Sequence, residues 1–77
     1  MTRFRVWGRV EQVAPGEFLA VVTAVPESGD PSGIQSLSEL LTSREDAQAA
    51  VKVFLVKMNA IVLALEGHVS HVEMHGM

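Results

Sequence analysis

Apolar and polar side chains alternate from Arg3 to Val13. The positions from Phe4 to Val10 that share one parity are apolar or glycine, whereas the positions between them are mostly charged. A period of two is typical of a β-strand that buries one face. We therefore predict a half-buried strand, whose second face carries Arg3, Arg5, Trp7, Arg9 and Glu11.

A turn over residues 14–17 separates this strand from a second, more apolar one over residues 18–25. Pro15 presets its own φ and Gly16 readily takes a positive φ, so the pair suits the tip of a hairpin. Pro26 then ends the second strand. The two segments together predict an antiparallel hairpin.

The position of the turn also predicts a register for the hairpin. With Pro15-Gly16 at the tip, Val10 faces Val21 and Val6 faces Val25. In this register the face that holds Trp7 gains an apolar patch large enough to need cover in the assembled protein. The members of that patch are Val13, Phe18, Ala20 and Val22.

The segment after the hairpin is harder to assign. Residues 27–33 (ESGDPSG) have the composition of a loop. Residues 34–41 fit either one helical turn, through the spacing of Ile34 and Leu37, or an irregular edge strand, through their partial alternation. We favour the strand.

A long helix is predicted over residues 43–66. Thr42 and Glu45 have the spacing of a capping box, Ser43 is an alternative first residue, and Gly67 is a natural C-terminal cap. Residues 68–75 then form a short last strand.

Two apolar seams run along this helix on nearly opposite faces. The inner seam consists of Ala47, Val51, Phe54, Met58, Ile61 and Leu65. The outer seam consists of Ala49, Val53, Val56, Ala60 and Leu63. A helix that lies on one sheet needs a single apolar seam. We therefore predict that the inner seam covers the sheet and that the outer seam is an oligomer interface.

These elements predict one α+β domain over residues 1–77. Its architecture is a two-layer sandwich, in which a small antiparallel sheet (β-β-(β)-α-β) carries one long helix on one face. The composition, 48% hydrophobic and 19% charged, excludes a disordered chain. Small domains are commonly stabilised by disulfides, metals or oligomerisation, and this chain has no cysteine. We therefore expect a homodimer or a higher homo-oligomer.

The sequence favours a cytoplasmic protein. The longest apolar stretch, residues 49–65, is interrupted by Lys52, Lys57 and Asn59, whereas a membrane span needs about 20 mostly apolar residues. The first residues lack the apolar core of a signal peptide. We expect neither a membrane span nor secretion.

Charge is distributed unevenly along the chain. The net charge is −3, which argues against a general nucleic-acid binder, yet three of the six basic residues lie in the first ten positions. An aromatic ring among arginines can stack a base and hold phosphates. The same residues also fit a solvated strand face or an interface anchor. The candidate nucleic-acid site is Arg3, Arg5, Trp7 and Arg9.

The last strand carries a candidate metal site. His71, Glu73 and His75 share one strand face, and a His-x-Glu-x-His pattern can place two or three ligands on one metal ion. The alternative is a polar terminal strand, which is the interpretation that we favour. His68 is expected on the other face. We predict no bound metal and no cofactor.

Two segments resemble the N-terminal domain of HicB-like antitoxins. Residues 17–22 (EFLAVV), leading to Pro26, are similar to the second strand of that family, and residues 42–47 (TSREDA) are similar to the start of its helix. Glu66-Gly67 before a short strand also fits. The resemblance implies a βββαβ order, a helix packed on one sheet face, and oligomerisation. Family members are partners of an RNA-cleaving toxin.

The sequence as a whole predicts a non-catalytic interaction module that binds itself, with another protein as a further candidate partner. No serine lies in a nucleophile elbow, and no glycine-rich phosphate loop is present. The alternative function is a nucleic-acid-binding or antitoxin-like protein that uses the arginine and tryptophan face of the first strand.

Overall fold

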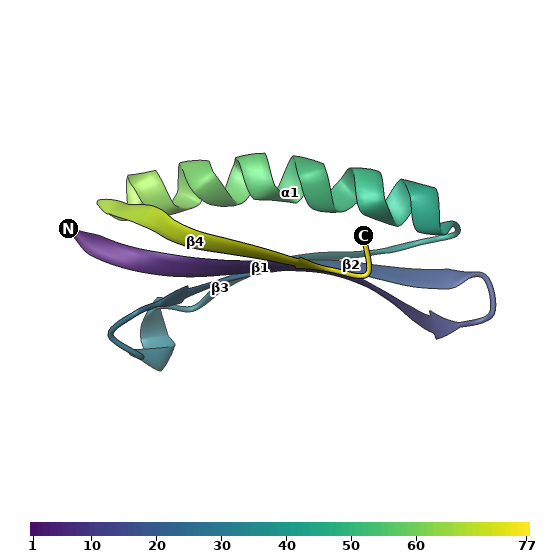
Figure 1. Ribbon diagram of the computed structural model, residues 1–77, viewed down its shortest axis with the longest axis horizontal. Coiled ribbons are helices and arrows are strands. Elements are labelled where there is room, and N and C mark those ends of the chain that lie inside the picture. The colour runs from purple at the N-terminus through teal and green to yellow at the C-terminus, as the bar shows by residue number, and fades with distance from the viewer.

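The computed structural model describes all 77 residues as two layers, a four-stranded sheet and one long helix (Figure 1). The helix lies along one face of the sheet. This arrangement confirms the predicted α+β class. The elements in chain order are β1 (Thr2–Ala14), β2 (Glu17–Pro26), the short 3-10 helix η1 (Pro31–Gly33), β3 (Gln35–Leu41), α1 (Arg44–Ala64) and β4 (Gly67–His75).

The sheet is mixed rather than wholly antiparallel. Its strand order is β3-β2-β1-β4, in which β2 is antiparallel to both β1 and β3, whereas β4 is parallel to β1. The single helix α1 returns the chain to the end of the sheet where β3 began. Strand β4, which follows α1, therefore runs in the same direction as β3. Because β3 and β1 run in the same direction, β4 is parallel to β1. The strand favoured for residues 34–41 is confirmed as β3.

The predicted register of the hairpin is wrong by one residue. Val10 lies opposite Ala20 and Val6 opposite Ala24, because the pairing shifts between Gln12 and Ala14. The turn itself is as predicted, with Gly16 at a φ of 72°. The unpaired Val13 forms a β-bulge, which takes up one residue next to the turn.

The shifted register exchanges the two faces of β2. Ala20, Val22 and Ala24 are fully buried beneath α1, where the predicted register had placed them beside Trp7. Small side chains at these positions let the helix lie close to the sheet. The residues of β2 that share the face of Trp7 are instead Leu19, Val21, Thr23 and Val25.

The inner seam of α1 covers the sheet, as predicted. Ala47, Val51 and Met58 are fully buried, and Phe54 and Ile61 pack against the same cluster. The seam ends sooner than expected, because Leu65 is 49% exposed. Only 13 of the 77 residues are buried, so the core is one thin layer between helix and sheet.

Both ends of the helix differ in detail from the prediction. The helix begins after Ser43, whose hydroxyl oxygen accepts a hydrogen bond of 3.1 Å from the backbone N–H of Asp46. Ser43, and not Thr42, is therefore the N-cap. At the other end Glu66 takes the positive φ of 60°, and Gly67 is already the first residue of β4.

By length and composition alone, α1 is apolar enough to cross a membrane. One such helix is weak evidence for a span, because the core helix of a globular domain has the same properties. Here Ala47, Val51, Met58 and Val62 of α1 form the core with the sheet. The arrangement is that of a small globular domain.

Candidate functional site

The outer seam of α1 is uncovered along its whole length. Ala49 and Ala60 are exposed, and the larger members Val56, Leu63 and Val53 are 73%, 57% and 51% exposed. All five lie on the side of the helix that faces away from the sheet. The structure thus places the predicted interface residues in one apolar stripe on the surface.

A shallow apolar groove lies between the flank of α1 and strand β4. It has a volume of about 230 Å³, and its lining includes Leu55 and Asn59 from the helix and Val69 and Val72 from the strand. The helix does not cover β4 completely, and Val72 is half-exposed. Apolar surface therefore continues from the helix onto the sheet edge.

The sheet face that points away from α1 is called the open face here. It joins the charged face of β1 to an apolar strip on β2 and to the histidines of β4. The loop that carries η1 extends from one end of the sheet on the side away from α1 (Figure 1). The main residues of the open face are Arg3, Arg5, Trp7, Arg9, Leu19, Val21, Thr23, Val25, His68, His71, Glu73 and His75.

A bulge in β4 places all three histidines on the open face. His68 pairs with Arg3, and His71 pairs with Arg5, so Ser70 is the extra residue. The hydroxyl of Ser70 lies within hydrogen-bond distance of the Glu27 carboxylate and 3.2 Å from the carbonyl oxygen of Phe4, and its one proton serves one of these acceptors at a time. The prediction that His68 lies on the other face is therefore wrong.

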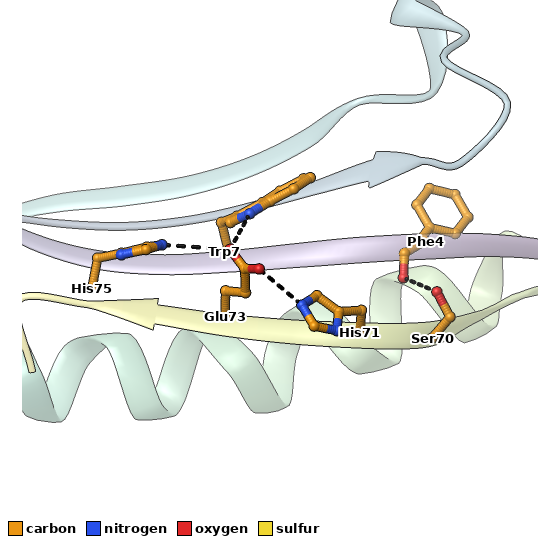
Figure 2. Close-up of polar contacts among 6 residues, drawn as sticks. All are labelled: Phe4, Trp7, Ser70, His71, Glu73 and His75. Atoms are coloured by element: carbon orange, nitrogen blue, oxygen red, sulfur yellow. Dashed lines mark hydrogen bonds and ion pairs between the residues drawn. The ribbon is translucent and has the colours of Figure 1, made fainter.

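Glu73 is the centre of a hydrogen-bonded cluster on the open face (Figure 2). Its carboxylate accepts a bond of 3.0 Å from the indole Nε1–H of Trp7 and another of 3.0 Å from Nε2 of His71. Nε2 of His75 lies 3.6 Å from the carboxylate oxygen that accepts the bond from Trp7. The cluster fixes the orientation of the indole ring.

The same geometry describes the candidate metal ligands. The imidazoles of His71 and His75 approach different oxygens of the Glu73 carboxylate, from opposite directions along the strand (Figure 2). The structure contains no group of three or more His, Cys, Asp or Glu side chains arranged to hold a metal ion. In this structure His71 is hydrogen-bonded to Glu73, and His75 lies 3.6 Å from the same carboxylate.

The cluster lowers the pKa of Glu73 below its ordinary value. The main cause is the hydrogen bond from His71, and the second is the bond from Trp7. Both stabilise the charged carboxylate. A lowered pKa in the folded state contributes stability above the ordinary pKa of the group, and this contribution is lost as the pH falls through the folded pKa. The Glu73 cluster therefore stabilises the fold less in acid.

We expect the pKa of Glu73 to rise towards its ordinary value in the variants His71→Ala and Trp7→Phe. Each change removes one donor to the carboxylate, and His71→Ala should have the larger effect because its bond is the larger cause. His75→Ala, the matched control on the same strand, should change the pKa least. Side-chain carboxyl NMR titrations of the four proteins measure these shifts. An unchanged pKa in His71→Ala would contradict the cluster.

Trp7 and the arginines of β1 are neighbours on the open face. The Arg5 guanidinium lies 5.7 Å from the centre of the indole ring, within the range of a cation–π interaction. Arg9 is 3.9 Å from Glu11 in an exposed ion pair. A shallow depression of about 250 Å³ beside the indole is lined by Trp7, Arg9, Val21, Thr23 and His75.

Sequence reasoning missed the contribution of β2 to this face. Leu19, Val21 and Val25 lie there only because of the bulge at Val13, and no residue type in the turn marks that bulge. The patch expected beside Trp7 is therefore wrong in its residues, because Ala20 and Val22 lie beneath α1, and Leu19, Val21 and Val25 lie on the face of Trp7 instead.

Comparisons of the chain with protein-family models, with curated proteins and with solved structures find no match in any of the three. The function must therefore be inferred from the chemistry of the outer seam and of the open face.

Proposed function

We propose that this chain is a small, non-catalytic interaction module that works as a homodimer joined through the outer seam of α1. The observation that supports this proposal best is the exposure of the seam, in which Val56 alone is 73% exposed. A continuous apolar stripe on a helix that already covers its sheet is typical of a surface that binds another protein.

The spacing of the seam suits a second copy of the same chain. In an antiparallel pair of helices related by a two-fold axis through Val56, Ala49 of one copy lies opposite Leu63 of the other. The same axis brings Ala60 close to Val53. Val56 meets its own copy at the axis, and on either side of it a small side chain meets a larger one. The arrangement is self-complementary, as a two-fold interface requires. The alanines allow the helices to approach closely.

The thin core gives the chain a reason to associate. A domain of this size buries only about 60% of the surface that its unfolded chain exposes. The absence of cysteine leaves no disulfide to offset this. A second copy packed on the outer seam would give α1 apolar contacts on both sides.

The proposed role without catalysis rests on the kind of surface that the chain exposes. The pKa values of Asp30 and Glu73 are lowered by hydrogen bonds that their carboxylates accept, from the side chain and backbone N–H of Ser32 and from His71 and Trp7. Acid–base catalysts instead tend to combine desolvation with a cleft. The depression beside Trp7 and the groove between α1 and β4 are both shallow, and the groove is apolar.

The cytoplasm is the compartment that we propose for this chain. The antitoxin-like role stays a prediction.

Ala60→Glu should weaken self-association by about tenfold or more, equivalent to about 1.4 kcal/mol. The change places a charged side chain within the apolar stripe of the proposed contact, which desolvates it, while the monomer should be affected by only about 0.5 kcal/mol because Ala60 is exposed. Light scattering after size-exclusion chromatography over a concentration series measures the mass. The wild type should approach twice the chain mass of 8.3 kDa.

Gln12→Glu is the matched control, because it adds the same charge at an exposed position near the hairpin turn. It should leave the mass unchanged. A folded wild type that remains at 8.3 kDa throughout the series, or an equal effect of both variants, would contradict the proposed interface.

A further inference from the structure

The arginines on β1 are spaced regularly along the open face. Residues of one strand face recur about every 6.7 Å, because each residue advances the strand by about 3.3–3.4 Å. Arg3, Arg5, Trp7 and Arg9 occupy four successive positions of this kind, and all three arginines are exposed. This spacing is similar to that of successive phosphates along an extended single strand of nucleic acid.

Trp7 interrupts the arginine row with an aromatic surface. Its indole is held by the bond to Glu73 at 3.0 Å and is approached on one side by Arg5. The depression beside it has apolar walls from Val21 and a cationic rim from Arg9. A flat ring that enters this depression would contact the indole, and the attached phosphates would lie among the arginines.

We propose that the open face binds a short single strand of nucleic acid, with a base stacked on Trp7 and phosphates held by Arg3, Arg5 and Arg9. Base stacking on an aromatic ring is sequence-tolerant, and arginines follow the backbone. The row is long enough for three or four nucleotides. This surface lies on the opposite side of the molecule from the outer seam, so the inference does not depend on the proposed dimer.

The indole among the arginines favours this partner over an acidic protein segment, because a carboxylate side chain offers no flat ring to stack on Trp7. The charges on the open face also disfavour a second sheet. Glu73 is the acidic residue nearest to the indole, and its carboxylate already accepts hydrogen bonds from Trp7 and His71. Glu11 lies farther along β1, towards the hairpin turn, and is paired with Arg9. A second copy placed face to face would bring like-charged arginine rows together, which is unfavourable.

Fluorescence anisotropy with labelled dT12 and rU12 at low salt tests the proposal, and Trp7, the one tryptophan, reports stacking by quenching. Both oligonucleotides should bind. A plot of the logarithm of the association constant against the logarithm of the salt concentration should have a slope of about −2, since each of the three phosphate contacts on a single strand contributes about −0.7. A matched duplex should bind more weakly, because its bases are not free to stack.

Variants then assign the contacts. Arg5→Gln should reduce the salt slope by about 0.7, whereas Lys57→Gln, which makes the same charge change on α1, should leave it unchanged. Trp7→Leu should weaken binding by about tenfold or more, and Trp7→Phe by much less, because phenylalanine still stacks. Glu73→Gln should strengthen binding, since it removes a negative charge from the face. Circular dichroism melts confirm that each variant is folded.

Four outcomes would overturn the inference. They are no binding of either oligonucleotide at low salt, equal losses in Arg5→Gln and Lys57→Gln, duplex binding as tight as that of the single strands, and equally tight binding of polyglutamate. The last would identify an acidic polypeptide as the partner of this face.

Discussion

Replacing Met58 with alanine is expected to lower the free energy of unfolding by about 2–5 kcal/mol. Met58 is among the largest fully buried side chains, and it lies on the inner seam of α1 against the sheet. Removing its thioether chain leaves a cavity in a core that is one layer thick. Few neighbouring side chains are available to fill that cavity, so the cost should exceed the simple loss of buried area.

Urea unfolding followed by circular dichroism measures this change. The wild type and variant must be compared at one protein concentration, because a dimer gains stability with concentration. Leu40→Ala is the matched control, since Leu40 is exposed on the edge strand β3 and should contribute less than about 1 kcal/mol. A similar loss in both variants would show that Met58 does not lie in the core.

The helix is the part of the fold that the sequence predicts best. The members of each seam recur every three or four residues, which places the inner and the outer seam on opposite sides of α1. Whether a residue is buried depends mainly on which side of α1 it occupies. Val51 is buried and Val53 is exposed for this reason. One sheet can cover only one side of a helix, so the outer seam, on the side of α1 that points away from the sheet, is exposed.

The sheet is less predictable, because its faces depend on single-residue bulges. The bulge at Val13 moves Ala20 and Val22 into the core, and the bulge at Ser70 brings His68 to the open face. A slip of one residue inverts a strand's faces. Neither bulge has a distinctive residue type, so the composition of the open face could not be derived from the alternation alone.

The proposed dimer and the proposed nucleic-acid surface are compatible in one assembly. Contact through the outer seam of α1 places the two helices in the middle and the two sheets outside. Both open faces, each with its Trp7, then remain accessible on opposite sides of the dimer. Ala60→Glu should therefore separate the copies without removing the affinity of a single open face for an oligonucleotide.

Gly67→Ala is expected to destabilise the fold by about 1–3 kcal/mol, the usual cost of overpacking a core. A Cβ at this position would lie 2.6 Å from Cε1 of Phe4 and 3.0 Å from the carbonyl oxygen of Thr2. Phe4 is 3% exposed, so its ring has little room to move away. Gly67 is thus needed for its size at the start of β4, and not for a left-handed backbone at the end of the helix.

A double-mutant cycle with Phe4→Leu separates this contact from other effects of the added methyl group. Phe4→Leu alone should destabilise the chain, because it leaves a space beneath the helix. In the Gly67→Ala background the same change should cost less, since the smaller side chain relieves the clash with the new methyl group. Urea unfolding of the four proteins at one concentration gives the coupling energy. Strictly additive losses would mean that Phe4 is not the residue that restricts position 67 to glycine.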